Sequence, residues 1–163
     1  MLQHSSIKTP LGALTVISRE ETLLTAGFSS MSTLLKKVVR LEGESTPKTV
    51  RKIPGVTDLI LDYFDGDLTA IDRINVSQSG AEFSQKAWNA MRRVRAGKTI
   101  SYSQLAKAAG STEAVRAAGS ACAKNAIVLV VPCHRIVKTG GALGNYAYGV
   151  RYKEWLLSHE GAI

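Results

Sequence analysis

A cysteine and a histidine stand side by side in the second half of this 163-residue chain, at the end of an apolar run. The run over 128–137 reads Val-Leu-Val-Val-Pro-Cys-His-Arg-Ile-Val, so Cys133 is followed directly by His134 and Arg135. A thiol is a strong nucleophile only as the thiolate, and imidazole and guanidinium neighbours favour that form. Cys133 is therefore a candidate reactive centre, although free cysteines are also commonly buried and inert. The other cysteine, Cys122, is interpreted as a small packing residue.

The composition restricts the kinds of site that the chain can build. Two cysteines and three histidines (His4, His134 and His159) provide neither a disulfide framework nor the spacing of a zinc finger. We therefore expect no structural metal and no cofactor. No stretch approaches the roughly 20 apolar residues that cross a bilayer, and the N-terminus lacks the features of a signal peptide. These absences predict a globular protein with no membrane partner, located in the cytoplasm or, in a eukaryote, in the nucleus.

The net charge of +8 lies entirely in the second half of the chain. Residues 1–78 contain nine Lys or Arg and nine Asp or Glu, whereas residues 79–163 contain twelve and four. Lys and Arg gain affinity for nucleic acid by displacing counterions from phosphates. A basic half that carries the candidate nucleophile indicates a polyanionic target, and the alternative is a basic surface that only keeps the protein in solution.

The pattern of the second half predicts helices around the candidate nucleophile. Apolar residues recur at helical spacing over 81–94, and residues 101–110 are typical of a capped helix that ends at glycine. A second helix over 114–124 follows a tight turn, which predicts a helix-turn-helix. A buried strand over 127–131 then leads to Cys133, a glycine-rich loop over 138–149 suits a site wall, and a last helix spans 150–159.

The first half alternates polar and apolar residues as strands do, and its expected elements are strands over 6–9, 12–18, 23–28 and 70–76, helices over 31–41 and 56–64, and a surface loop over 43–54. The change in charge coincides with the polar stretch 77–80. We predict an α+β protein, in which a small sheet-and-helix domain (1–78) precedes a helical, winged-helix-like helix-turn-helix domain (79–163).

Several separated motifs in a fixed order resemble those of the O6-alkylguanine-DNA alkyltransferases, also called methylated-DNA–protein-cysteine methyltransferases. In the second half these motifs are Ser101-Tyr102, Arg116-Ala117, Asn125, Pro132-Cys133-His134-Arg135, Gly144-Asn145-Tyr146, Lys153-Glu154-Trp155-Leu156-Leu157 and His159-Glu160-Gly161. The first half is similar more loosely, at Thr9-Pro10-Leu11-Gly12 and Tyr63-Phe64-Asp65-Gly66-Asp67-Leu68.

The resemblance implies DNA repair by a suicide reaction. An alkyl (methyl) group on O6 of a flipped-out guanine would pass irreversibly to Cys133, with activity on O4 of thymine left open. By similarity, His134 takes the Cys133 proton through a bridging water, and Glu160 orients the imidazole. Tyr102 would protonate guanine N3, and Asn125 would brace the turn before the active-site strand.

The resemblance also implies a DNA-binding surface and a substrate pocket. Arg116 would fill the gap left by the flipped base, and the rest of the surface would comprise Ala114, Ala117, Ala118, Ala121 and Arg135. The pocket would comprise Tyr102, Val131, Pro132, Tyr146, Ala147 and Tyr148. Many relatives have Ser and Gly where this chain has Ala147 and Tyr148, and the larger Tyr148 is expected to narrow the pocket. The expected partner is double-stranded DNA containing O6-alkylguanine, contacted mostly at phosphates by a monomer, with cooperative assembly on DNA left open.

Three other functions fit parts of the sequence. A module that recognises alkylated DNA without transfer would share the DNA-binding parts, but such proteins lack the cysteine. A helix-turn-helix regulator would need base-reading side chains on its second helix, where only Arg116 qualifies. A cysteine hydrolase could use the same Cys, His and Glu groups, but it would turn over, whereas the alkyltransferase is consumed.

Overall fold

The computed structural model describes all 163 residues, and the chain divides into two compact units. Residues 1–79 and 126–130 form unit 1, and residues 80–125 and 131–163 form unit 2. A division at one point, after residue 78, does not anticipate the return of residues 126–130 to the first unit. Neither unit contains a helix long and apolar enough to span a membrane.

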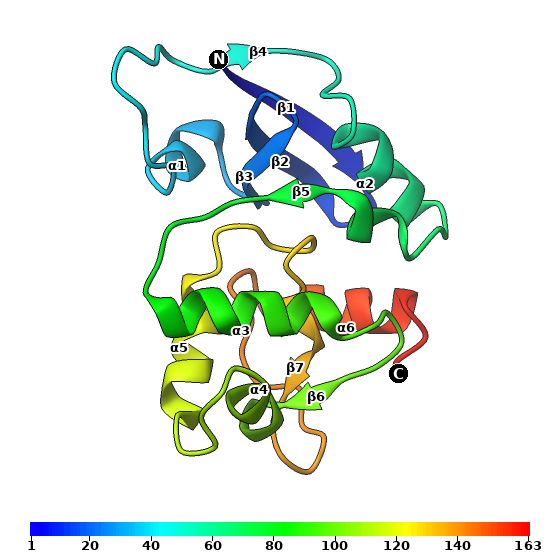
Figure 1. Ribbon diagram of the computed structural model, residues 1–163. Coiled ribbons are helices and arrows are strands. Elements are labelled where there is room, and N and C mark those ends of the chain that lie inside the picture. The colour runs from blue at the N-terminus through cyan, green and yellow to red at the C-terminus, as the bar shows by residue number, and fades with distance from the viewer. The chain divides into compact units, whose positions relative to one another are not determined.

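Unit 1 is built on a five-stranded sheet in the order β4-β1-β2-β3-β5 (Figure 1). Its strands are β1 (Leu2–Thr9), β2 (Gly12–Arg19), β3 (Thr22–Gly27), β4 (Lys48–Thr49) and β5 (Asn75–Val76). The three long strands form an antiparallel meander, and the two short edge strands run parallel to β1 and β3. The three strands predicted for this meander are present, but β1 begins four residues earlier than expected, and β4 is a short strand inside the expected loop.

Helices cover the sheet of unit 1. The five-residue helix α1 (Met31–Leu35) buries Leu34 in a core cluster with Ile17 and Leu24 of the sheet. Because successive side chains of a strand point to opposite faces, the equally buried Leu14 and Val16 of β2 lie on the other face from Ile17. The second helix, α2 (Thr57–Phe64), agrees with the prediction to within one residue. A 3-10 turn, η1 (Ala70–Arg73), precedes β5, so the predicted strand over 70–76 is wrong except at its end.

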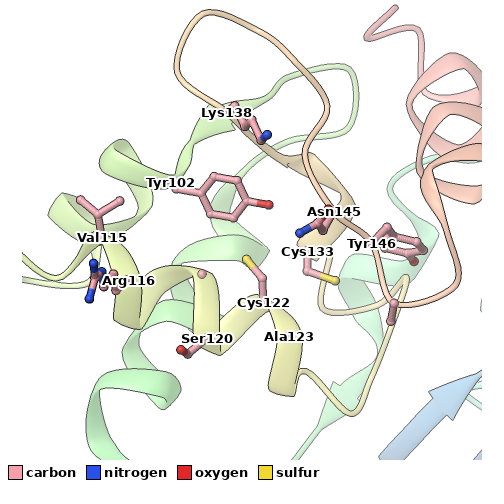
Figure 2. Close-up of a pocket in the computed structure, with 12 residues that line it drawn as sticks. Tyr102, Val115, Arg116, Ser120, Cys122, Ala123, Cys133, Lys138, Asn145 and Tyr146 are labelled. Atoms are coloured by element: carbon pink, nitrogen blue, oxygen red, sulfur yellow. The ribbon is translucent and has the colours of Figure 1, made fainter.

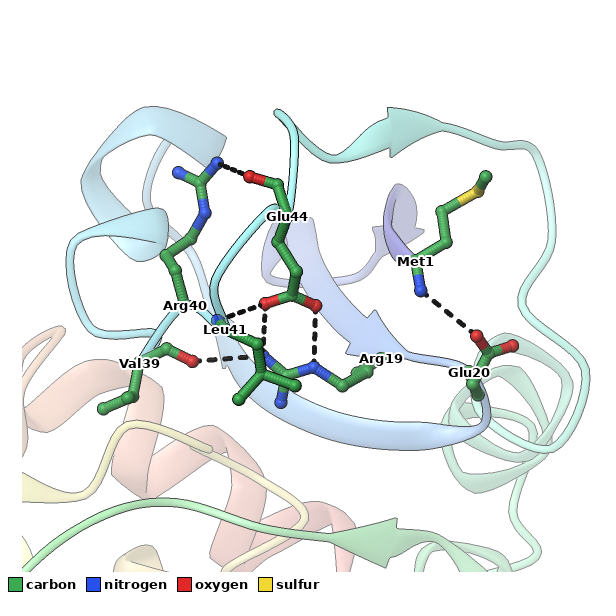
Figure 3. A network of polar contacts seen from close by, with 7 residues as sticks. All are labelled: Met1, Arg19, Glu20, Val39, Arg40, Leu41 and Glu44. Atoms are coloured by element: carbon green, nitrogen blue, oxygen red, sulfur yellow. Dashed lines mark hydrogen bonds and ion pairs between the residues drawn. The ribbon is translucent and has the colours of Figure 1, made fainter.

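The predicted helix over 31–41 is also too long, because polar contacts hold the chain in a turn after residue 35. Arg19 donates from Nη2 to the Val39 carbonyl (Figure 3). It also donates to both carboxylate oxygens of Glu44, from Nε at 2.8 Å and from Nη2 at 2.7 Å. The Leu41 amide donates to the same carboxylate. The guanidinium and this amide hold the pKa of Glu44 down at about 2, so the carboxylate is charged at neutral pH. These contacts compete with the helical hydrogen bonds that residues 36–41 would otherwise make.

Unit 2 is mainly helical and contains one small sheet (Figure 1). In chain order its elements are α3 (Glu82–Arg93), β6 (Ile100–Ser101), α4 (Tyr102–Ala108), α5 (Val115–Lys124), η2 (Cys133–Arg135), β7 (Ile136–Val137) and α6 (Val150–His159). The four predicted helices agree with α3, α4, α5 and α6 to within two residues. Ser101 and Gln104 form the capping box at the start of α4, and the indole of Trp88 on α3 donates to the Ala121 carbonyl of α5 at 2.9 Å.

The parallel pair β6 and β7 joins the segment that leads into Tyr102 to the segment that follows Cys133. Ile100 pairs with Ile136, and Ser101 pairs with Val137. Tyr102 follows β6 directly, and the turn η2 with Cys133 ends directly before β7. In this parallel pair Tyr102 and Cys133 extend from opposite ends of the short ladder, and both line the same pocket, although 31 positions separate them in the sequence.

The predicted strand over 127–131 is wrong. Ile127 makes a single bridge with Ala26, and the next residues turn, with Leu129 in the left-handed region at φ 73°. The apolar side chains of residues 127–131 are still buried. Residues 126–130 form an irregular excursion into unit 1 in place of a ladder of strand hydrogen bonds. Asn125 closes this excursion because its Nδ2 donates to the Val131 carbonyl at 2.8 Å.

Candidate active site

The candidate nucleophile lies in a pocket of about 780 Å³ in unit 2. This volume is typical of sites for small molecules. The lining residues come from α4, α5, η2 and the loop before α6, and they are Tyr102, Val115, Arg116, Gly119, Ser120, Cys122, Ala123, Cys133, Lys138, Asn145, Tyr146 and Ala147. Figure 2 shows Tyr102, Cys122, Cys133 and Tyr146 around one end of this space, with Val115 and Arg116 at the other.

Cys133 lines the pocket with only 5% of its surface exposed. Burial raises the pKa of its thiol, since a charged sulfur loses hydration there. A hydrogen bond from Asn125 and the positive charge of Lys153 act in the opposite direction. Burial prevails, so the resting thiol is protonated at neutral pH and needs a base before it can attack.

His134, Arg135 and Glu160 form a buried chain of polar contacts behind Cys133. The His134 Nε2 lies 2.9 Å from Glu160 Oε2. Arg135 binds both oxygens of the same carboxylate, through Nε at 2.9 Å and Nη2 at 2.8 Å, and donates from Nη1 to the Val94 carbonyl. The two Arg135 contacts make a bidentate pair, which holds the carboxylate in one orientation. Glu160 is in turn fixed against the imidazole.

The charges of this chain of contacts leave a neutral imidazole beside the thiol. Burial would raise the pKa of Glu160, but the hydrogen bonds from His134 and Arg135 outweigh it and hold the pKa well below its usual range. Burial also lowers the pKa of His134, against the attraction of Glu160. Because Arg135 already balances the carboxylate, a second cation in the same buried site is unfavourable. His134 is therefore neutral, its Nε2 hydrogen points to Glu160, and its Nδ1 keeps a lone pair with no hydrogen-bond partner.

The Tyr102 ring forms another wall of the pocket and lies close to the backbone of the loop before α6. A Cβ on Gly144 would come within 3.0 Å of the Tyr102 hydroxyl, and Gly144 has φ 78°. Only glycine combines this approach with this backbone conformation. Burial raises the pKa of Tyr102, with smaller contributions from Cys122 and Cys133. The phenol therefore stays protonated at neutral pH and can donate a hydrogen bond into the pocket.

Comparisons with known proteins identify the family of this chain. A family model described as "6-O-methylguanine DNA methyltransferase, DNA binding domain" matches residues 82–162. The methylated-DNA–protein-cysteine methyltransferase of Salmonella typhimurium is 39% identical over 167 residues, a match that covers 99% of this chain and 97% of the relative. The chain belongs to the methylated-DNA–protein-cysteine methyltransferase family. The family predicted from the sequence motifs is thereby confirmed.

Solved structures extend the similarity to the whole chain. The crystal structure of the Mycobacterium tuberculosis O6-methylguanine methyltransferase has a TM-score of 0.80 and 26% identity, over 99% of this chain and 94% of that one. A Mycobacterium tuberculosis relative crystallised in complex with DNA has a TM-score of 0.76 and 25% identity, over 98% and 93%. The α+β fold predicted from the sequence is confirmed for this family member.

The structure corrects three of the residues predicted to contact DNA. Arg135 is 1% exposed and is occupied by Glu160 and the Val94 carbonyl, so it is part of the protein interior. Ala118 and Ala121 are completely buried on the inner face of α5. Arg116 and Ala117 are exposed and Ala114 is half-buried, so these three are available to a partner.

The predicted pocket is also corrected in part. Tyr102, Tyr146 and Ala147 line it, whereas Val131, Pro132 and Tyr148 are not among the lining residues. Val131 and Pro132 are buried directly after residues 126–130, which belong to unit 1. The Tyr148 ring packs 6.5 Å from that of Tyr146 and 6.1 Å from that of Tyr152, measured between centroids. Tyr148 therefore packs within an aromatic cluster that includes the pocket residue Tyr146, and its expected effect on the width of the pocket stays a prediction.

Several pocket residues of this methyltransferase family member were not predicted. Cys122 was interpreted as a packing residue, yet it lines the pocket together with Gly119, Ser120 and Ala123 of the same helix. Helical spacing could have predicted most of these residues. Residues 116, 119 or 120, and 123 share one face of a helix, while 118, 121 and 125 share another. Lys138 and Asn145 also line the pocket, but they lie in a loop whose course the sequence pattern does not define.

Proposed function

We propose that Cys133 is the residue that accepts the methyl group in the methylated-DNA–protein-cysteine methyltransferase reaction of this chain. One observation carries this assignment: Cys133 lines the pocket next to a neutral His134 whose far nitrogen is bound to Glu160. The lone pair on Nδ1 is then the only strong base beside the thiol, since Glu160 is occupied by Arg135. Asn125 supports the same thiol through its hydrogen bond.

The proposed reaction transfers one methyl group, while one proton leaves the thiol and another is supplied to the base. His134 Nδ1 takes the thiol proton through a bridging water, and Glu160 stabilises the imidazolium that forms. The Cys133 sulfur attacks the methyl carbon, a sulfur–carbon bond forms, and the bond from carbon to guanine O6 breaks. The electron pair stays with the guanine, and the Tyr102 hydroxyl donates a proton toward N3 as negative charge develops on the base. A thioether is stable, so each molecule reacts once.

The proposed substrate is double-stranded DNA that contains O6-alkylguanine, bound by a monomer. The basic half of the chain supplies the charge for phosphate contacts, and the Mycobacterium tuberculosis relative crystallised with DNA supports DNA binding. O6 of a stacked guanine cannot reach the sulfur of Cys133, a residue that is only 5% exposed, so the base must leave the duplex. Arg116, exposed at one end of the pocket, is placed to fill the gap in the duplex.

A titration of repair against protein tests this function. A duplex with one O6-methylguanine, held in excess, is incubated with increasing amounts of protein, and the remaining O6-methylguanine is quantified by chromatography after hydrolysis. We expect loss of the lesion to stop at one per protein molecule, because the acceptor is consumed. Continued turnover would contradict the proposal, and so would tight binding of the lesion without any loss of it, which would indicate a recognition module.

Replacing Arg116 with alanine is expected to slow methyl transfer from a duplex by about tenfold while affecting a single-stranded substrate much less. Flipping a base costs a few kcal/mol, part of which Arg116 would offset by filling the gap in the duplex. Losing about 1.4 kcal/mol of that stabilisation lowers the transfer rate tenfold. The ratio of the two single-turnover rates is the measurement. Lys124→Ala is the matched control, because Lys124 is an exposed cation on the same helix that does not line the pocket. An equal loss with both substrates in Arg116→Ala would contradict a role in base flipping.

A further inference from the structure

Lys153 is a buried cation in the candidate active site to which the proposed reaction gives no part. It lies in the first half of α6 with 1% of its surface exposed. Its Nζ donates to the Ile136 carbonyl at 2.6 Å and to the Asn145 carbonyl at 3.2 Å, and it lies 5.9 Å from the centroid of the Tyr102 ring. Burying an ammonium group is costly unless its charge is used or balanced.

No carboxylate balances this charge. Glu160, the buried acid of the site, is bound to His134 and Arg135, and Lys153 makes no ion pair. The partners of its Nζ are two neutral carbonyls and an aromatic ring. The ionisable groups of the pocket that interact with Lys153 are the two thiols, Cys133 and Cys122. The positive charge of Lys153 therefore acts on the sulfur that must become negative before it can react.

The two carbonyls that Lys153 binds belong to different walls of the pocket. Ile136 is the first residue after the turn that carries Cys133, whereas Asn145 lines the pocket from the loop before α6. The near arm of that loop is closed by its own backbone, through hydrogen bonds between Lys138, Gly141 and Ala142. The Lys153 ammonium thus links β7, which follows the nucleophile, to the arm of the loop that carries Asn145.

We propose that Lys153 is a positioning residue for methyl transfer, whose ammonium holds the Asn145 arm of the loop against the strand after Cys133 and places a positive charge opposite the sulfur. This inference deepens the proposed function and rests on Cys133 being the acceptor. It assigns to α6 a second task beside carrying Glu160 at its end.

The electrostatic part of the proposal has a definite sign. Burial raises the pKa of Cys133, and the charge of Lys153 opposes that effect. Burial lowers the pKa of Lys153, and the thiolates oppose this in turn. Tyr102 faces the same space as a neutral phenol, and His134 is neutral, so neither replaces the ammonium. Removing the charge must therefore raise the pKa of Cys133 further and reduce the thiolate fraction at neutral pH.

The test measures the reactivity of Cys133 toward iodoacetamide as a function of pH, because this reagent needs neither DNA nor a flipped base. Trypsin separates the two thiols, since Cys133 falls in the peptide 125–135 and Cys122 in 117–124. In Lys153→Met we expect an inflection roughly one pH unit higher and labelling of Cys133 about tenfold slower at neutral pH. Lys153→Arg keeps a positive charge and should retain the wild-type inflection.

Arg151→Met is the matched control, because it removes one exposed cation from the same helix. Its inflection should equal that of the wild type. An unshifted inflection in folded Lys153→Met, or an equal shift in Arg151→Met, would overturn the proposal. A thermal melt identifies the variants that fold. If Lys153→Met does not fold, Lys153→Gln takes its place; if neither neutral variant folds, Lys153→Arg decides, and a shifted inflection in that variant overturns the proposal.

Methyl transfer from the O6-methylguanine duplex is then compared in the same proteins. We expect Lys153→Met to lose more rate in this reaction than in iodoacetamide labelling, because the loose loop also impairs binding of the base. Equal losses of rate in methyl transfer and in iodoacetamide labelling would contradict the part of the proposal in which Lys153 holds the loop. Wild-type protein that transfers no methyl group would instead refute the proposed function, and the iodoacetamide profiles would still test the charge of Lys153 separately.

Discussion

Replacing Cys133 with alanine is expected to abolish methyl transfer completely while leaving the fold and DNA binding intact. The sulfur is the atom to which the methyl group becomes bonded, so no other part of the site can compensate for its loss. Alanine removes one buried sulfur atom, which should cost about 1 kcal/mol of stability. Because Cys133 is only 5% exposed, its side chain contributes little surface to DNA binding.

The measurement is single-turnover loss of O6-methylguanine, accompanied by a gel-shift assay and a thermal melt of the variant. Retained lesion binding without transfer would separate recognition from chemistry in the same molecule. Cys122 remains in this variant as an internal control, because it lines the same pocket. Burial raises the pKa of the Cys122 thiol to about 12, so we expect no transfer to it. Full activity of Cys133→Ala would show that the acceptor has been assigned to the wrong residue.

Replacing Glu160 with glutamine is expected to have the second largest effect, on both stability and rate. Glutamine keeps the shape of the side chain but leaves the buried Arg135 without a negative partner. Removing one partner of a buried ion pair costs about 3–5 kcal/mol, a large part of the total stability of a small protein. The imidazolium of His134 would also lose its counterion, so methyl transfer should slow by two orders of magnitude or more, on the order of a typical general-base contribution.

The same substitution should change how stability depends on pH. The pKa of Glu160 is lowered in the folded protein, so its contribution is fully present above the ordinary value of 4.5 and is lost as the pH falls below it. The lowered pKa of His134 adds a loss of the same sign below 6.5. Denaturant unfolding from about pH 5 down to pH 3 should therefore show a steeper loss of stability for the wild type than for Glu160→Gln, which lacks the carboxylate contribution. Glu154→Gln, an exposed position on α6, is the control and should follow the wild type.

Local patterns in the sequence predicted most of the elements that carry the site. The capping box of Ser101 and Gln104, and the apolar stripe that includes Trp88, depend on residues close together in the chain, and both helices lie where they were expected. The helix over 150–159 was predicted to the residue. The order of separated motifs predicted the family, and adjacency alone brought Cys133 and His134 together.

Burial and loop course could not be predicted in the same way. Arg135 next to a cysteine suggests an exposed cation, and only the position of Glu160 and the Val94 carbonyl explains why it is interior. The β-branched run over 127–131 favours a strand, but the left-handed Leu129 and the hydrogen bonds at Ala26 give an irregular excursion instead. Lys153 was visible only as part of a motif, since its carbonyl partners come from segments that no periodicity connects to it.

The most direct test of the account is to locate the methyl group after reaction. Wild-type protein is incubated with a duplex that carries one O6-methylguanine with an isotopically labelled methyl group, and the tryptic peptides are analysed by tandem mass spectrometry. The account predicts one labelled methyl group on the peptide 125–135, at the sulfur of Cys133, in an amount equal to the guanine restored in the DNA. Label on the Cys122 peptide, or restored guanine without label on Cys133, would contradict it.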